Sequence, residues 1–207
     1  GADRQDPPFV GIMANGTSGD VNNRDITAPQ VKQKPYQRMN QVADDLAETA
    51  QGVYEHLQWR DRVELDAELE LLELEIRKPN AARLEWARQT AAPVDSKLRL
   101  TRPQIYAREA LALADYPERV NIPLQALRIG DLAIGAIPNE VFAETGLAIK
   151  ADSAFPKNTF VIELANAYYG YLPSPEQHAA GGYESWDARS SCLEVDAETK
   201  IRTKMLE

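Results

Sequence analysis

Two segments far apart in the chain carry residues whose types and spacing suit a hydrolase site. The first, Asn15–Asn23, is a turn of small and polar residues that brings backbone amides and the Asp20 carboxylate to one point. The second offers Glu140 after a Pro-Asn pair, then Tyr171 and Tyr183, twelve residues apart in a Gly- and Pro-rich stretch. A carboxylate at the end of a strand can bind a metal ion. A phenol can bind a metal or donate a hydrogen bond to a developing oxyanion.

Each of these residues also has a structural interpretation. Glu140 lies where a helix is expected to start, and the macrodipole favours a negative charge there. The tyrosines can simply pack beneath a loop. Ser18 is a weak candidate nucleophile, because its surroundings are not Gly-x-Ser-x-Gly and no His/Asp pair is suitably spaced.

The ligands of a complete zinc site are not evident in the sequence. Zinc enzymes use three protein ligands and keep one open position. The chain has two histidines, of which His56 is expected near a helix C-terminus and His178 in the tyrosine-containing loop, where it could line the cleft. Cys192 is the single cysteine and has no companion at metal-ligand spacing.

Length and composition are those of one soluble domain over residues 1–207. The chain is 43% hydrophobic and 27% charged. Its net charge of −9 argues against nucleic-acid binding, which depends on clustered Lys and Arg. The longest basic cluster, Arg77-Lys78, is interpreted as a strand end, and no apolar run is long enough to span a bilayer.

The spacing of apolar residues predicts how these segments are positioned. Residues 9–14 are expected to form a buried strand that delivers the glycine turn. Residues 63–76 alternate with one slip, which predicts an edge-type strand with a bulge. Residues 120–129 and 132–137 flank Gly130-Asp131 and predict a hairpin, and 160–165 predict a strand interior to a sheet.

Helices and loops complete the prediction. The predicted helices cover 38–57, 81–92, 104–114, 138–149 and 197–206. Residues 166–195 are expected to form a long loop. Strands and helices therefore interleave, and the fold class is α/β of the mixed α+β kind, with mixed sheets flanked by helices.

Taken in order, these residues resemble the catalytic domain of the neutral/alkaline non-lysosomal ceramidases. The resemblance rests on 15–23, 121–140 and 166–184 and spans most of residues 9–207. In that family two upstream histidines, a glutamate and a tyrosine hold zinc, and a second tyrosine polarises the amide carbonyl. By motif position, Glu140, Tyr171 and Tyr183 look like these last three residues, and Asp20 and Asn22 would hold the turn or orient the substrate.

The chain departs from the family pattern in two ways. The family motif Gly-Asp-x-Ser-Pro has a serine where this chain has Asn22, which can form hydrogen bonds but cannot act as a nucleophile. Hydrolysis by a zinc-bound water would survive this change, whereas ceramide becomes a doubtful substrate. No histidine precedes Asn15, so the chain is expected to be the C-terminal part of the catalytic domain. The missing N-terminal part is an expected partner.

The resemblance implies a bacterial, ceramidase-like, zinc-dependent hydrolase of a lipid or other N-acyl amide, secreted or periplasmic. Two alternatives remain open. The chain could be a non-catalytic binding or assembly module that keeps the fold, as the loss of the serine and histidines suggests. It could also be a folded but inert fragment of a larger enzyme.

Overall fold

The computed structural model describes residues 4–25, 27–29, 31–91 and 99–207. Contacts divide the chain into two compact units, one of Gly1–Val21 with Leu65–Glu207 and the other of Asn22–Glu64. All the candidate site residues except Asn22 belong to the larger unit. The assignment of residues 1–207 to one domain stays a prediction, since a compact unit need not fold alone.

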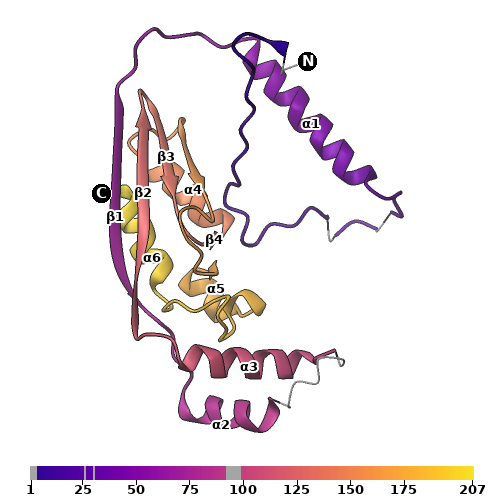
Figure 1. Cartoon of the computed structure of the whole chain (residues 1–207), viewed down its shortest axis with the longest axis vertical. Coiled ribbons are helices and arrows are strands. Elements are labelled where there is room, and N and C mark those ends of the chain that lie inside the picture. Colours follow the sequence, from indigo (N-terminus) through magenta and orange to yellow (C-terminus); the bar gives the residue numbers. More distant parts are fainter. Residues whose placement is uncertain (1–3, 26, 30, 92–98) are drawn as a thin grey trace. The chain divides into compact units, whose positions relative to one another are not determined.

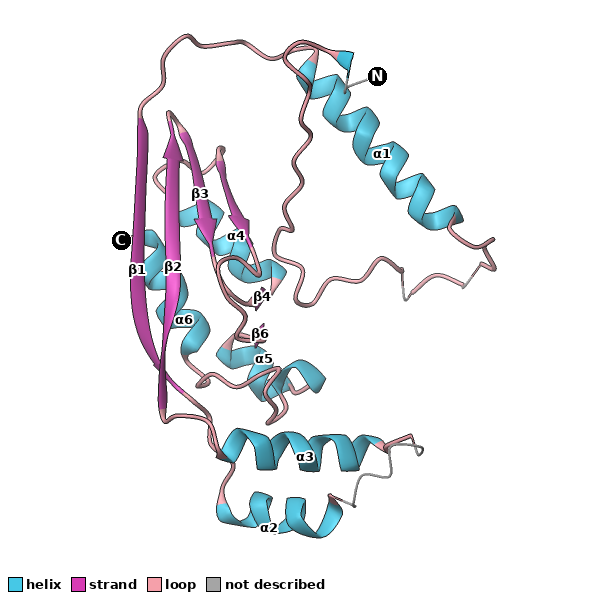
Figure 2. Cartoon of the chain, in the orientation of Figure 1, coloured by secondary structure: helices cyan, strands magenta, loops and turns pink. Residues whose placement is uncertain are grey.

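A four-stranded mixed sheet organises the larger unit (Figure 2). Its strands, in spatial order, are β1 (Leu65–Glu75), β2 (Arg119–Ile129), β3 (Leu132–Ala136) and β5 (Thr159–Ile162). The first three pair antiparallel, and β3 pairs parallel with β5. The predicted hairpin at Gly130-Asp131 is confirmed, and Gly130 takes the positive φ of 63° that such a turn requires. The mixed α+β class is confirmed.

The predicted edge strand is confirmed, but its bulge is wrong. β1 pairs with β2 in one unbroken register from Leu65 to Glu75. Leu74 lies on the inner face and is buried, whereas Leu69 and Leu71 point to the opposite face and stay exposed. The slip in the apolar pattern therefore marks leucines on both faces of a regular strand.

One core connects the sheet to the helices α4 (Ala143–Asp152) and α6 (Ala197–Leu206). The core includes Leu74 and Ile122 from the sheet, Ile149 from α4 and Ile201 from α6. The helices α2 (Ala81–Thr90) and α3 (Arg102–Ala114) pack together at one end of the strands through small residues (Figure 1). The predicted helices at these places are confirmed, except that residue 92 lies outside the described residues.

The smaller unit contains α1 (Gln37–Tyr54), which confirms the helix predicted over 38–57. None of its described residues is buried. His56 follows the helix end, as predicted, and its Nδ1 lies 2.8 Å from the Gly52 carbonyl oxygen. In the described part of the chain, no helix is long and apolar enough to cross a membrane.

Four other local predictions are wrong. Residues 9–14 form no strand and are exposed. The helix predicted from residue 138 begins at Ala143, because residues 140–141 form the short strand β4 instead. β5 lies at the edge of the described sheet, not in its interior. The loop predicted over 166–195 contains three short elements, namely β6 (Tyr171–Leu172), α5 (Pro175–Ala180) and the 3-10 turn η2 (Tyr183–Ser185).

Candidate functional site

A two-stranded parallel ladder brings Glu140 and Tyr171 together. β4 (Glu140–Val141) pairs with β6, and Glu140 and Tyr171 are register partners. The Glu140 backbone N–H donates to the Gly170 carbonyl at 2.9 Å. Register partners on neighbouring strands lie about 5 Å apart and present their side chains to the same face. The backbone therefore sets side by side the residues that carry this carboxylate and this phenol, from segments 31 positions apart in the chain.

Two further tyrosines complete the cluster. The Tyr168 hydroxyl donates to Glu140 Oε1 at 3.0 Å. The ring of Tyr183 meets that of Tyr171 edge to face, with centroids 5.7 Å apart. Burial, hydrogen bonding to Tyr183 and the nearby Glu140 carboxylate raise the pKa of Tyr171 far above its usual value. Without a cation beside it, the Tyr171 phenol therefore stays protonated.

The glycine turn docks directly against β4. The Gly19 N–H donates to the Val141 carbonyl at 2.8 Å. A β-carbon at position 19 would lie 2.8 Å from the Glu140 carbonyl carbon, a distance that real β-carbons do not reach. Gly146 in α4 has the same character, because a β-carbon there would meet the Thr17 side chain. Close packing thus requires glycine at both positions, against the Glu140 backbone at Gly19 and against the Thr17 side chain at Gly146.

Glu163 holds the turn in place from inside the protein. It is 4% exposed and follows β5. Its carboxylate accepts hydrogen bonds from the Ser18 N–H at 3.1 Å, from the Ser18 hydroxyl, from Asn15 Nδ2 at 3.2 Å and from the Val141 N–H at 2.9 Å. These four donors satisfy a carboxylate that no described cation neutralises.

Asp20 and Asn22 have local roles in the structure. Asp20 Oδ1 accepts from the Ala143 N–H at 2.8 Å and so caps the first turn of α4. Asn22 belongs to the smaller unit, and its Oδ1 accepts from the Arg24 N–H at 3.1 Å. Asp20 is consequently placed to support the turn, while the proposed part of Asn22 in catalysis stays a prediction.

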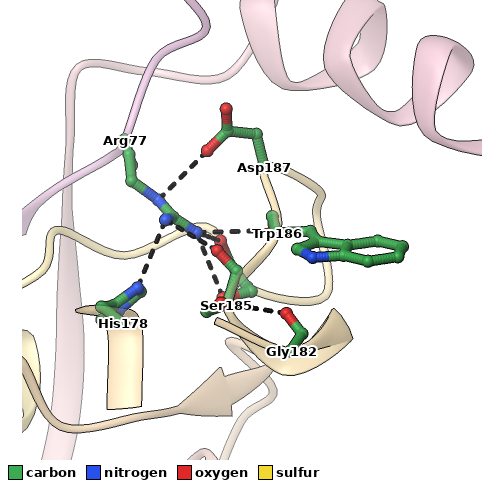
Figure 3. A network of polar contacts seen from close by, with 7 residues as sticks. Arg77, His178, Gly182, Ser185, Trp186 and Asp187 are labelled. Atoms are coloured by element: carbon green, nitrogen blue, oxygen red, sulfur yellow. Dashed lines mark hydrogen bonds and ion pairs between the residues drawn. The ribbon is translucent and has the colours of Figure 1, made fainter. Parts of the chain in front are cut away.

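Arg77 anchors the segment that carries Tyr183 (Figure 3). Its guanidinium donates to the Ser185 carbonyl at 2.9 Å and to the Ser191 carbonyl at 2.8 Å, and its Nε lies 3.5 Å from Asp187 Oδ1. Burial lowers the pKa of Arg77, and the Asp187 charge opposes that shift. Arg77 is therefore more than a strand end, since it ties the end of β1 to η2 and to the segment that follows η2.

His178 faces this arginine, as Figure 3 shows. Its Nδ1 lies 3.4 Å from Arg77 Nη1, so the imidazole nitrogen accepts and the ring is neutral. Burial and the positive charge of Arg77 both lower the pKa of His178. The cleft-lining prediction for His178 stays open, but its Nδ1 is engaged by Arg77.

The donor set fits two positions of a zinc site. Glu140 and Tyr171 would supply two oxygen ligands side by side, whereas a zinc enzyme uses three protein ligands. In the residues that the structure describes, no three His, Cys, Asp or Glu side chains are grouped to hold a metal ion. Cys192 is buried, and burial raises the pKa of its thiol to about 11, which is unsuited to a metal-binding thiolate.

Two important residues escaped the sequence interpretation. Glu163 stands alone as an acid in the apolar run Phe160–Ala165, and that isolation was an available signal of a buried, hydrogen-bonded carboxylate. Tyr168 lies three residues before Tyr171 in the same tyrosine-containing stretch. Nothing in the spacing singled it out as the hydrogen-bond donor to Glu140.

The fold is that of a segment of the ceramidases. No family profile matches the chain, and no curated protein is significantly similar to it. Among solved structures, the neutral ceramidase from Pseudomonas aeruginosa is similar with a TM-score of 0.59 and 16% identity, covering 96% of this chain and 36% of that one. A ceramidase complexed with C2 has a TM-score of 0.54 and 16% identity, covering 84% and 34%. The chain thus spans about a third of the length of these structures.

Proposed function

We propose that this chain supplies one part of the active site of a zinc-dependent amide hydrolase. The observation that carries the proposal is the ladder between β4 and β6, which sets Glu140 and Tyr171 side by side with Tyr183 against them. The ceramidase fold supports the same class of reaction. The substrate class is an N-acyl amide, of which ceramide-like lipids are one example.

Glu140 and Tyr171 would hold zinc, with the remaining ligands provided from outside the described residues. Zinc bound there would lower the pKa of a water ligand and polarise the amide carbonyl. The Tyr171 phenol must lose its proton to ligate, and its raised pKa makes this dependent on the cation. Tyr168 fixes the orientation of the Glu140 carboxylate through its hydrogen bond.

Tyr183 is the proposed oxyanion donor. Its side chain is 52% exposed, so a substrate can reach it. The contact with Tyr171 and the anchoring of η2 by Arg77 limit where its hydroxyl can lie. A fixed phenol lowers the barrier by donating to the oxygen that becomes negative as the amide carbon turns tetrahedral.

A non-catalytic module with the same fold is the second candidate. It is favoured by the absence of a three-ligand metal group among the described residues. The two candidates are separated by the zinc content and the amidase activity of the protein expressed from its complete reading frame. The hydrolase should hold about one zinc per chain and cleave a fluorogenic N-acyl amide, whereas the module should do neither.

Substitution then tests each role. Glu140→Ala should remove zinc and activity together, and unchanged zinc content would overturn the ligand assignment. Tyr183→Phe should keep the zinc and lower kcat by about 100-fold, the usual cost of losing one oxyanion donor. Unaltered turnover in Tyr183→Phe would remove the proposed role of this phenol.

A further inference from the structure

A pocket of about 340 Å³ lies where α2 and α3 meet the segment after Tyr183. Its volume is in the range of small-molecule sites. The residues around it combine aromatic rings with cationic groups, and they are Arg83, Trp86, Arg102, Pro103, Tyr106 and Trp186. None of the predicted hydrolase residues lines this pocket.

The apolar walls of the pocket are held firmly. Tyr106 and Trp186 meet edge to face with ring centroids 4.6 Å apart. Trp186 directly follows η2, and its carbonyl lies 3.4 Å from Arg77 Nη2 (Figure 3). Trp86 projects from α2, which packs on α3 through Ala87 and Ala107. Rigid aromatic walls favour the binding of an aliphatic or aromatic body.

Two arginines in the pocket are stacked but lack acidic partners. The Arg83 guanidinium carbon lies 4.0 Å from the centroid of the Trp86 ring, and that of Arg102 lies 6.0 Å from the Trp186 ring. Within the described part of the chain, Arg83 Nε is buried and has no hydrogen-bond partner. Neither arginine forms an ion pair there, although the chain has 32 acidic residues against 23 basic ones.

Other arginines that lie in α2 or contact α3 do have acidic partners. Arg88, also in α2, pairs with Glu85 at 3.7 Å, and Arg189 binds Glu109 at 2.7 Å. Buried polar groups normally have partners, and a stacked guanidinium leaves its N–H edge free to bind a carboxylate in bidentate fashion. The two guanidinium groups, which have no acidic partner among the described residues, are therefore of the kind that a ligand anion completes.

We propose that this pocket binds a small amphipathic carboxylate, with its carboxylate on Arg83 and Arg102 and its apolar body against Trp86 and Trp186. A neutral ligand could accept a hydrogen bond from a guanidinium N–H but would leave both positive charges without an anion. A free inorganic anion would leave the aromatic walls without contacts. This inference rests on the pocket alone and stands whether or not the protein hydrolyses amides.

The probe for this proposal is decanoate, with the neutral decanamide as its matched control. Binding to the full chain is followed by tryptophan fluorescence, because Trp86 and Trp186 line the pocket, and by titration calorimetry. Decanoate should bind at least about tenfold more tightly than decanamide, the effect of one charge-assisted contact. Inorganic phosphate alone should not compete.

Variants of matched charge separate the pocket from the general electrostatics of the chain. Arg83→Gln and Arg102→Gln should each weaken decanoate binding by about tenfold. Arg88→Gln and Arg108→Gln change the same helices by the same charge and should leave binding unchanged, and circular dichroism checks that all four fold. Undetectable decanoate binding, equal binding of decanamide, or an equal loss in Arg108→Gln and Arg102→Gln would overturn the proposal.

Discussion

Gly19 and Glu140 are in contact through their backbones, so that a β-carbon on the glycine would lie 2.8 Å from the Glu140 carbonyl carbon. The glycine turn thereby buttresses the strand that carries the candidate metal ligand. The Gly19 N–H also donates to the Val141 carbonyl at 2.8 Å. This bond holds the two backbones so close together that position 19 has no room for a side chain.

Gly19→Ala should therefore destabilise the protein and displace Glu140. Forcing a methyl group into this contact should lower the free energy of unfolding by about 1–3 kcal/mol. Urea denaturation followed by circular dichroism measures this change. Gly52→Ala is the control, because a β-carbon there meets nothing within 4 Å. A Gly19→Ala protein as stable as the parent would contradict the close approach.

Glu163→Gln should loosen the glycine turn without changing the volume of the side chain. Four donors converge on this carboxylate, and an amide NH₂ would face donors in place of one acceptor oxygen. The expected loss of stability is about 1–3 kcal/mol. Hydrogen exchange should show faster exchange at the Ser18 and Val141 amides. Equal exchange at both amides would show that the carboxylate is dispensable.

Tyr171 should make stability fall at alkaline pH. Its folded-state pKa is raised, chiefly by burial, so the unfolded chain releases this proton first. Stability is then complete below the unfolded pKa of about 10 and declines as the pH rises above it. Urea midpoints at pH 8 and pH 11 measure the decline. Tyr171→Phe should reduce it, whereas Tyr36→Phe in the smaller unit should not.

Arg77→Lys should free the segment around Tyr183. Lysine keeps the charge but cannot reach the Ser185 and Ser191 carbonyls and Asp187 at once, as the planar guanidinium does. Hydrogen exchange over residues 178–191 should quicken while that of β2 stays unchanged. Because lysine keeps the positive charge, the pKa of His178 should stay lowered, and NMR titration of the imidazole checks this. A segment with unaltered exchange would contradict the anchoring role.

Most helices and strands could be predicted from the sequence, because the spacing of apolar residues within one segment indicates which element it forms. The helix predicted over 197–206 matches α6, since Ile201 lies on a face that packs into the core. The strand at 120–129 matches β2 for the same reason. Leu71 and Leu72 misled the prediction, because adjacent leucines on opposite faces of β1 resemble a bulge although the ladder is continuous.

Elements that form only by pairing with a distant segment could not be predicted from local residue patterns. Residues 140–141 have the composition of a helix start, but their backbone pairs with β6, some thirty positions later, and so they form a strand. The run at 9–14 is apolar, yet no described strand pairs with it and it stays exposed. Glu140, Tyr171 and Tyr183 were singled out by residue type and resemblance. Their contacts with Tyr168 and with each other could be identified only from the structure.

The two-residue ladder of β4 and β6 has a consequence for sequence divergence. Main-chain hydrogen bonds, which depend little on side-chain identity, set the separation of the two residues that carry the carboxylate and the phenol. Neighbouring side chains are then free to change during evolution while that separation is inherited. The chain can therefore accept many side-chain changes near the ladder, provided the peptide register between positions 140 and 171 is kept.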